Sequence, residues 1–421
     1  MLGLVLTAGG ARGAYQAGVL KRISEQPALR NRPSPFAIVA GASAGAINGS
    51  LLAARSERFA DAASAAADIW SNLRFEQVIR TDPAALAWRG VALARDFVLG
   101  PLLGSTITHG LFDTSPLAAL IEGVFPARGI AAAIRRGDVY AVALSATSYH
   151  SGRSYTFVQG RSGHPVWTKS RRVVLPVTLT HQHILASSAI PIVFPPVQIT
   201  SAGGELWFGD GGLRLVAPMS PAIRLGSTHL IAVGVRSSRA ADTLAMEEAG
   251  TALGLSRSLL PPPLAQVCGV FMNAIFLDHL DADLDHLHRM NELVAAQAPQ
   301  PATAAEPMRR VHPLVVSPSE DIALLAQRYA HRMPRLLRFV LDGLGTPDAQ
   351  SADLASYLLF DSAFTRALVD LGYRDAAARA DEIEALIADS GALARPVRAS
   401  RRASGPAPLD ARGAGRSLAS A

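Results

Sequence analysis

The sequence is short of cysteine, of lysine and of unbalanced charge. Its single cysteine, Cys268, permits no disulfide within the chain, which fits a reducing compartment. Only two of its 40 basic residues are lysines, and the formal net charge is +6. Six arginines and one aspartate after residue 394 give that end a charge of +5, so the other 394 residues carry +1. A nearly neutral body lacks the clustered basic face that nucleic acid requires, and we expect no nucleic-acid partner.

Sustained aliphatic runs are also missing. Two charge-free stretches reach membrane-spanning length, residues 33–54 and 258–277, but proline, glycine, asparagine and glutamine interrupt them. The first apolar run, residues 2–7, is short and has no basic region ahead of it, unlike a secretory signal. We therefore expect a soluble, cytoplasmic protein that can attach peripherally to membranes.

Hydrophobic residues are plentiful, at 49% of the chain, and their order is informative. In the first 240 residues, short apolar runs typical of buried strands alternate with helical patterns. The expected strands are residues 2–7, 36–40, 139–145 and 229–235, and the helices that follow the first two are residues 14–24 and 44–55. Such alternation predicts an α/β fold with a largely parallel sheet.

Beyond residue 240 the pattern changes. To residue 393 the periodicity is almost wholly helical, for example over residues 354–371 and 375–387. Residues 297–313 are rich in alanine, proline and glutamine and are expected to form a loop. The last residues have almost no large apolar side chain, which predicts disorder. The expected parts are a first domain over 1–240, a helical extension packed on it over 241–394, and a disordered Arg-rich tail over 395–421.

The first candidate site is the run GASAG at residues 41–45, between the second strand and its helix. In a strand–turn–helix elbow, Ser43 would occupy a tight turn that exposes its hydroxyl. The small Gly41 and Gly45 would let neighbouring backbones pack closely. The helix N-terminus adds a positive partial charge that stabilises a developing oxyanion. The pattern predicts a nucleophilic serine.

A second Gly-rich run, AGGARG at residues 8–13, also lies between a strand and a helix. Consecutive small residues there can present backbone N–H groups to an anion. A dinucleotide loop requires glycine where Ala8 stands, and a phosphate loop ends in lysine followed by serine or threonine. The run therefore fits an oxyanion hole better than either alternative.

The third run is GDGG at residues 209–212, after the apolar-aromatic strand end LWF at 206–208. Taken alone, this run would be an ordinary turn. Taken together and in this order, the three runs resemble the patatin-like phospholipase family. That family has a Gly-rich oxyanion loop with a basic residue, a G-x-S-x-G nucleophile and a D-G-G or D-G-A base.

The resemblance extends beyond these short runs, over about residues 1–385. ASSAIP at 186–191 and FPP at 194–196 are similar to the family's block upstream of the base. QAGVL at 16–20 continues the first helix as the family does. SYLLF at 356–360 and LGY at 371–373 are similar to the helical extension of bacterial members.

The resemblance implies a three-layer α/β/α fold with a mostly parallel central sheet, and it makes residues 1–240 the catalytic domain. It implies a dyad without histidine, in which Ser43 is the nucleophile and Asp210 the general base, with Gly211 and Gly212 shaping the turn of the base. The implied oxyanion hole uses backbone N–H groups of Gly9, Gly10, Ala11, Arg12 and Gly13. The implied reaction cleaves acyl esters of phospholipids or related lipids through an acyl-Ser43 intermediate, without a metal or other cofactor.

Two residues depart from the family's pattern. Ala8 replaces the loop's usual first glycine, and Val216 stands where bacterial members have asparagine after the base. These changes affect the turn of the Gly-rich loop and the support of the turn after Asp210, but they remove no reacting group. An ordinary aspartate has a pKa of about 4, low for a base at neutral pH. Burial near Trp207 and Phe208 would raise it.

Two other chemistries compete with the dyad. A Ser-His-Asp triad needs a histidine, and the candidates are His181, His183 and His229. Only His229 soon follows Asp210, but it lies inside an expected strand, where a structural role is more usual. A metal site would use the acidic and histidine row Asp278, Asp281, Asp285 and His288. Such a row is more often the solvated face of an amphipathic helix.

Two other functions remain open on the same fold. An acyltransferase would share the acyl-Ser43 intermediate, because transfer and hydrolysis differ only in the acceptor. A non-catalytic lipid-binding protein is disfavoured by the presence of both Ser43 and Asp210. In each case the expected partner is a phospholipid or another acyl-ester lipid, with peripheral membrane contact. The sequence indicates no protein partner.

Overall fold

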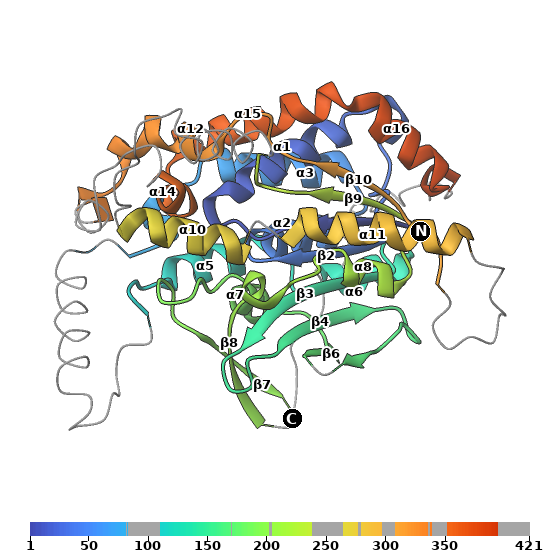
Figure 1. The fold of residues 1–421 in the computed structure, drawn as a ribbon, viewed down its shortest axis with the longest axis horizontal. Helices are drawn as coiled ribbons and strands as arrows, with labels where there is room; N and C mark the ends of the chain where they lie inside the picture. Colours follow the sequence, from blue (N-terminus) through green and yellow to red (C-terminus); the bar gives the residue numbers. More distant parts are fainter. Residues whose placement is uncertain are drawn as a thin grey trace, which may run out of the picture.

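The computed structural model describes residues 1–80, 82, 110–169, 171–201, 204–237, 264–276, 279–296, 308–335, 337–338 and 352–394. The expected Arg-rich tail lies outside the described residues, as do Asp278 and residues 297–307 of the expected loop. The described strands form one ten-stranded sheet (Figure 1). They are β1 Leu2–Leu6, β2 Ile38–Ala42, β3 Ala141–Ser148, β4 Ser154–Gly160, β5 Thr168–Lys169, β6 Arg172–Pro176, β7 Val197–Ser201, β8 Gly204–Asp210, β9 His229–Val233 and β10 His312–Val316.

The sheet runs in the order β10-β9-β1-β2-β3-β4-β6-β5, and β8 joins β3 and β7 from the side. Strands β10, β9, β1, β2 and β3 are parallel, whereas β4 and β8 run antiparallel to β3. Leu6 pairs with Gly41 on one side and Val233 on the other, so these strands end at one edge. Open parallel sheets bind ligands at that edge.

Helices cover both faces of the sheet. They are α1 Gly13–Ser24, α2 Ala44–Ala54, α3 Phe59–Ser71, α5 Ser115–Val124, α6 Gly129–Arg136, α7 His181–Ser187, α8 Ser220–Leu225, α10 Leu264–Phe276, α11 His279–Ala296, α12 Ile322–Tyr329, α14 Ala352–Leu358, α15 Ser362–Ala378 and α16 Ala380–Asp389. On β1, Leu4 and Leu6 face a core shared with α1, α2, α3 and α15, while Val5 faces a core shared with α8 and α11. The predicted three-layer α/β/α fold is confirmed (Figure 1).

The helical periodicity beyond residue 240 fails to predict β10. This strand pairs in parallel with β9 at the sheet edge, so the expected loop at 297–313 ends inside a strand. A five-residue apolar run does not reveal its own period, and only its position beside β9 makes it a strand. The C-terminal region is otherwise helical in its described parts.

The two long helices expected near the C-terminus are each divided. Residues 354–371 were expected to be continuous, but α14 ends at Leu358 and α15 begins at Ser362. The side chain of Asp361 accepts the N–H of Ala363 (3.0 Å) and caps the new helix. Residues 375–387 are likewise divided at Arg379, between α15 and α16.

Residues 33–54, the first charge-free stretch, contain β2 and α2, not one spanning helix. Another stretch, Ser115–Arg136, is long and apolar enough to cross a membrane by length and composition. In the structure it comprises α5 and α6, whose Leu117, Ile121 and Ile130 are buried in the core.

Candidate active site

Ser43 lies just beyond β2, in the turn that opens α2. Its φ of 55° and ψ of −125° are values that residues with a side chain rarely adopt. Such a turn is the backbone shape of a strand–turn–helix elbow. The residue is nearly buried, with 3% of its surface exposed. The fold therefore keeps Ser43 in a strained conformation at the ligand-binding edge of the sheet.

The glycines on either side of Ser43 have no room for a side chain. A Cβ atom on Gly41 would lie 2.4 Å from the carbonyl oxygen of Gly45. A Cβ atom on Gly45 would lie 2.2 Å from the carbonyl oxygen of Leu6. Both obstacles are backbone atoms, so the close packing expected of small residues is required here.

Two buried serines at the C-terminal end of α7 hold the elbow in place, although the sequence alone gave them no role. The Ser187 hydroxyl accepts the N–H of Ser43 (3.0 Å) and donates to the carbonyl of Ser145 (2.6 Å). The Ser188 hydroxyl donates to the carbonyl of Ser43 (3.1 Å). Both serines belong to the run ASSAIP at 186–191, and its resemblance to the family pattern was the signal that could have singled them out.

Asp210 is the last residue of β8 and has no exposed surface. Its Oδ1 accepts the N–H of Gly212 at 2.8 Å, while Oδ2 is buried and makes no hydrogen bond of ordinary geometry with the described residues. Burial raises the pKa of Asp210 to about 7, against the opposing effects of the Ser43 hydroxyl and the Gly212 N–H. The structure thus brings the two predicted reacting groups together.

Tyr149 is a neighbour of this carboxyl that sequence reasoning missed. Burial, and then the charge of Asp210, raise the pKa of the Tyr149 hydroxyl. A Cβ atom on Gly209 would lie 2.2 Å from that hydroxyl, so the ring packs directly on the strand before Asp210. No sequence pattern singles out this tyrosine, which comes from the end of β3.

The Gly-rich loop follows β1 and forms a short 3-10 helix, η1, over Gly10–Arg12. The N–H of Arg12 donates to the carbonyl of Gly9 (3.1 Å), and the N–H of Gly13 donates to carbonyls within the loop. These two amides would have to leave their bonds to reach a substrate. Gly10 lines the same cavity as Ser43 and has a φ of 56°.

The two departures from the family pattern have different surroundings. Ala8 is buried, and a Cβ atom on Gly212 would lie 2.7 Å from its methyl group, so the loop packs on the turn of the base. A Cβ atom on Gly211 would lie 2.0 Å from the carbonyl of Ser145. Val216 is exposed.

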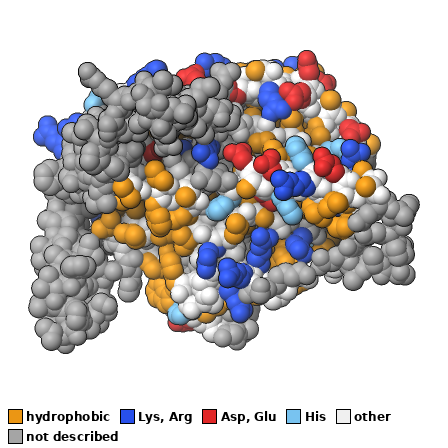
Figure 2. All heavy atoms as spheres, viewed as in Figure 1, with side chains coloured by type: hydrophobic (Ala, Val, Ile, Leu, Met, Phe, Trp, Pro, Cys, Tyr) orange, Lys and Arg blue, Asp and Glu red, His pale blue; other side chains and the backbone are white. Residues whose placement is uncertain are grey.

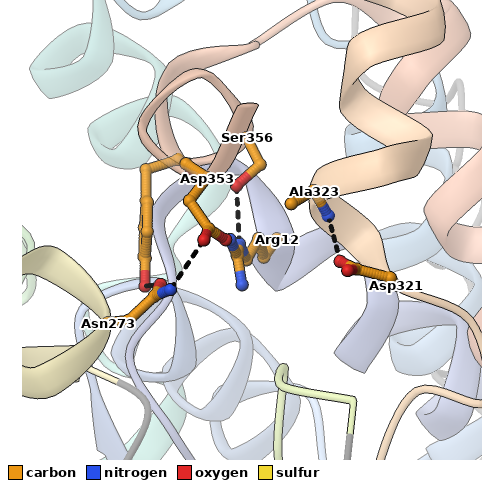
Figure 3. Close-up of polar contacts among 7 residues, drawn as sticks. Arg12, Asn273, Asp321, Ala323, Asp353 and Ser356 are labelled. Carbon is orange, nitrogen blue, oxygen red and sulfur yellow. Dashed lines mark hydrogen bonds and ion pairs between the residues drawn. The ribbon is translucent and has the colours of Figure 1, made fainter. Parts of the chain in front are cut away.

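The side chain of Arg12 points into the C-terminal region, towards Asp353 and Ser356 (Figure 3). Its Nε donates to Ser356 Oγ (2.7 Å), and its Nη2 pairs with Asp353 Oδ1 (2.8 Å). The guanidinium lies 4.4 Å from the centre of the Tyr357 ring. In this structure Arg12 is thus an internal anchor of the loop.

An apolar cavity opens beside Ser43. It is walled by α2, α3, α5 and α7, and among its lining residues are Leu51, Ile69, Leu120, Ile184, Phe194 and Phe360. Its few polar groups include Asn48, which donates to the carbonyl of Gly13 (2.9 Å) and accepts from the Trp70 indole (2.7 Å). The space is suited to a hydrocarbon chain, because its lining is mainly apolar and the Asn48 side chain is already hydrogen-bonded.

Two of the three histidines weighed for a triad, His183 and His229, have other partners. His229 begins β9, at the opposite end of the parallel strands from Ser43, and its Nε2 pairs with Asp389 (2.9 Å). His183 pairs with Thr180 through Nδ1, and burial lowers its pKa to about 4. Neither contact involves Asp210.

The acidic and histidine row falls on α11, apart from Asp278. The described residues contain no group of three or more His, Cys, Asp or Glu side chains that could hold a metal ion. Asp283, on the same helix, is buried and accepts the N–H of Met219 (2.8 Å). This carboxylate therefore joins α11 to the turn before α8.

Hydrophobic side chains gather around α10 on the face shown in Figure 2. Val267, Val270 and Phe271 of this helix are each about half exposed or more, at 49%, 61% and 61%. On its inner side, Phe276 is buried, and its ring lies 2.4 Å from where a Cβ atom on Gly212 would be. The helix thus connects an exposed apolar surface with the turn of Asp210.

Comparison with known proteins yields one family. The model of a family described as "Patatin-like phospholipase" matches residues 4–223, which is more than half of the 421 residues. No curated protein matches the chain. Among solved structures, VipD from Legionella pneumophila is 14% identical, with 87% of this chain and 66% of that chain covered and a TM-score of 0.28. The ExoU–SpcU complex from the type III secretion system of Pseudomonas aeruginosa is 14% identical, with 85% of this chain and 74% of that chain covered and a TM-score of 0.20. Both TM-scores are low.

Proposed function

Because the chain belongs to the family of patatin-like phospholipases, we propose that it is a lipid acyl hydrolase with Ser43 as nucleophile and Asp210 as general base. One observation carries this proposal above the others. Burial raises the pKa of Asp210 to about 7, and the Ser43 hydroxyl is one of the groups that act on this carboxyl. A base with a pKa near the working pH is ionised in part of the molecules and still accepts a proton well.

The proposed reaction has two halves. Asp210 takes the proton of the Ser43 hydroxyl as the oxygen attacks the ester carbonyl. The tetrahedral intermediate then expels the alcohol, which receives that proton, and an acyl-Ser43 ester remains. In the second half, Asp210 deprotonates a water molecule that attacks the acyl-enzyme, and it gives that proton to the Ser43 oxygen as the ester bond breaks. The products are a fatty acid and the free serine.

Backbone groups would stabilise the oxyanion of both halves. The N-terminus of α2 begins at Ala44 and carries a positive partial charge. From the loop, we assign the role to the amides of Gly9, Gly10 and Ala11, because those of Arg12 and Gly13 are bonded within the loop. Preorganised donors of this kind need no rearrangement during the reaction.

The apolar cavity would hold the acyl chain of the substrate. Gly10 and Ser43 are among its lining residues, and α2, α3, α5 and α7 supply most of the other side chains of its wall, which are mainly aliphatic and aromatic. A chain in this cavity would have its ester carbon beside the Ser43 hydroxyl. The substrate class is therefore a phospholipid or a related acyl ester, with water as the proposed acceptor.

A lipid surface is the proposed location of the substrate. The exposed residues Val267, Val270 and Phe271 of α10 would enter such a surface, and their helix contacts the turn of Asp210. Replacing Val270 and Phe271 with serine should weaken binding to phospholipid vesicles in a sedimentation assay. Leu324→Ser on α12, where the side chain is 47% exposed, is the matched control.

A fluorophosphonate probe tests the proposal directly. The probe should label the wild-type chain on Ser43, as shown by peptide mapping, and Ser43→Ala should prevent labelling while the circular dichroism spectrum stays the same. Labelled phospholipid should release fatty acid in parallel. Labelling at another serine, or hydrolysis by Ser43→Ala, would contradict the assignment. Acyl transfer to an added alcohol in preference to water would make the protein an acyltransferase instead.

A further inference from the structure

The C-terminal helices α10 and α14 touch both catalytic loops. The backbone of Tyr357, in α14, packs so closely on Gly10 that a Cβ atom there would lie 2.4 Å from the Tyr357 carbonyl oxygen. Phe276, in α10, packs equally closely on Gly212. Every reacting group of the proposed function lies in residues 1–240. The proposed extension, residues 241–394, nevertheless supplies part of the wall around them.

A buried charge joins this extension to the oxyanion loop. The side chain of Arg12 is 3% exposed, and that of Asp353, its partner, is 25% exposed. Ser356 fixes the geometry further, because its hydroxyl accepts from Arg12 Nε and donates to the carbonyl of Asp353 (2.5 Å). A buried guanidinium without its carboxylate is costly, so Arg12 and Asp353 have to stay together in the folded protein.

Asp353 also holds the two helices to one another (Figure 3). Its second oxygen, Oδ2, accepts from Asn273 Nδ2 of α10 at 2.9 Å. Asn273 in turn accepts the hydroxyl proton of Tyr357 through Oδ1, also at 2.9 Å. One carboxylate thereby connects the oxyanion loop, α14 and α10 through hydrogen bonds that fix the orientation of each group.

We propose that Asp353 and Asn273 are positioning residues, which place the oxyanion loop through Arg12. The inference rests on the proposed function for its catalytic consequence, although the placement of the loop can be measured separately. Gly9, Gly10 and Ala11 immediately precede Arg12, so a shift of the arginine moves the proposed donors. Misplacing catalytic groups by about 1 Å can cost about a hundredfold in rate.

The test compares two aspartates of the same region in the full-length protein. Asp353→Ala removes the partner of Arg12. Asp321→Ala removes a carboxylate that caps α12 by accepting the N–H of Ala323 (2.8 Å), and Figure 3 shows no dashed contact between Asp321 and Arg12. Hydrogen exchange of a peptide containing residues 8–13 should be faster in Asp353→Ala and unchanged in Asp321→Ala.

Kinetics with a soluble ester provide the second measurement. In Asp353→Ala, kcat should fall by about tenfold to a hundredfold with KM nearly unchanged, because the oxyanion exists only in the transition state. The acid limb of the pH profile should stay where it is in the wild type, since Asp210 is untouched. Asp321→Ala should keep the wild-type kcat.

A rescue separates positioning from general destabilisation. Asp353→Asn places two NH2 donors opposite each other, and adding Asn273→Asp restores a donor and an acceptor while Tyr357 and Arg12 keep their bonds. The double variant should regain much of the kcat that Asp353→Asn loses. Equal loop exchange in Asp353→Ala and Asp321→Ala, or no rescue, would overturn the inference. Faster loop exchange in a protein that the fluorophosphonate never labels would support it and refute the proposed hydrolase instead.

Discussion

The elbow at Ser43 and the loop at residues 9–13 leave neighbouring strands at one edge of the sheet, but different forces hold them. The elbow is fixed by backbone packing, with Gly45 against the carbonyl of Leu6 and Ser187 on the Ser43 amide. The loop also meets backbone, at the carbonyl of Tyr357 beside Gly10, but it is anchored by a side chain, a buried arginine whose partner is 341 positions away. Backbone packing tolerates no added atom, whereas a side-chain contact can be removed by one substitution.

The difference explains how far each region can be read from sequence. Apart from Ser187 and Ser188 at the end of α7, the residues that constrain the elbow lie within its own five residues and the strand beside it. The constraints on the loop come from helices that no local pattern links to it. The comparison also predicts that an added atom in the elbow lowers mainly the stability of the fold, whereas loss of the loop's anchor lowers the rate of the proposed reaction in addition to stability.

The largest expected effect belongs to Asp210, whose turn is held by backbone contacts as the elbow is. Asp210→Asn should lower turnover by about a hundredfold to ten-thousandfold, because the amide keeps the shape but cannot accept the proton. His183→Gln and His229→Gln are the controls in the same esterase assay and should retain most activity if they fold. A single histidine as indispensable as Asp210 would replace the dyad with a triad.

The same substitution should stabilise the fold at high pH. The carboxyl of the unfolded chain has a pKa of 3.8, and that of the folded chain about 7. Between these values the folded protein holds a proton that the unfolded chain has lost, so wild-type stability falls as pH rises from about 4 to 7 and is level above. The difference corresponds to at most ~4 kcal/mol.

Thermal unfolding measures this effect. Asp210→Asn cannot ionise, so its Tm should exceed that of the wild type at pH 8, and the difference should shrink towards pH 4. A Tm difference that is the same at both pH values would show that the carboxyl is not held in a raised-pKa state. In that case ionisation of Asp210 would not lower the free energy of unfolding, and Asp210→Asn would gain nothing from removing the charge.

Adding one methyl group to the elbow and one to the loop tests whether the two regions differ in their effect on stability. Gly45→Ala should lower the free energy of unfolding by about 1–3 kcal/mol or more, because the new Cβ atom meets the carbonyl of Leu6. Gly10→Ala should retain more of the fold, since the backbone carbonyl that its Cβ meets, that of Tyr357, belongs to α14 and not to a central strand of the sheet, but it should slow fluorophosphonate labelling. Circular dichroism melts and labelling rates give both quantities. A Gly10→Ala variant that unfolds before Gly45→Ala would reverse the ranking.

Ser187→Ala gives the smallest of these effects. It removes an acceptor for the Ser43 amide and a donor to Ser145, and should cost about 1–2 kcal/mol in urea unfolding. Labelling of Ser43 should continue at a reduced rate, because the backbone packing of Gly41 and Gly45 remains. Ser50→Ala, at a buried hydroxyl of α2 that makes no hydrogen bond with the described residues, is the matched control.

Much of the fold followed from the sequence, because parallel strands buried on both faces are continuous apolar runs. The strands β1, β2, β3 and β9 and the order of the three Gly-rich runs were found in this way. β10 was missed because its five residues become a strand only beside β9. The break at Asp361 was missed because the helical periodicity continues across it.

The candidate site was predictable where one residue type permits one geometry. Ser43, Gly41 and Gly45 belong to that class. The roles of Ser187, Tyr149 and Asp353 were not predictable, since serine, tyrosine and aspartate are common on any surface and only the folded chain brings these three to the loops. The raised pKa of Asp210 likewise depends on burial, which the sequence suggested through its aromatic neighbours but could not establish.

The distance along the chain between Arg12 and Asp353 has a consequence for protein synthesis. A ribosome adds about 5–20 residues per second, so the 341 positions between them take roughly 17 to 70 seconds to make. During that interval Ser43 has already been made, but the partner of Arg12 has not. The nascent chain would therefore carry its nucleophile before it could complete an oxyanion hole. The proposed lipid hydrolase would therefore be less active towards membranes until its C-terminal helices have been synthesised and packed.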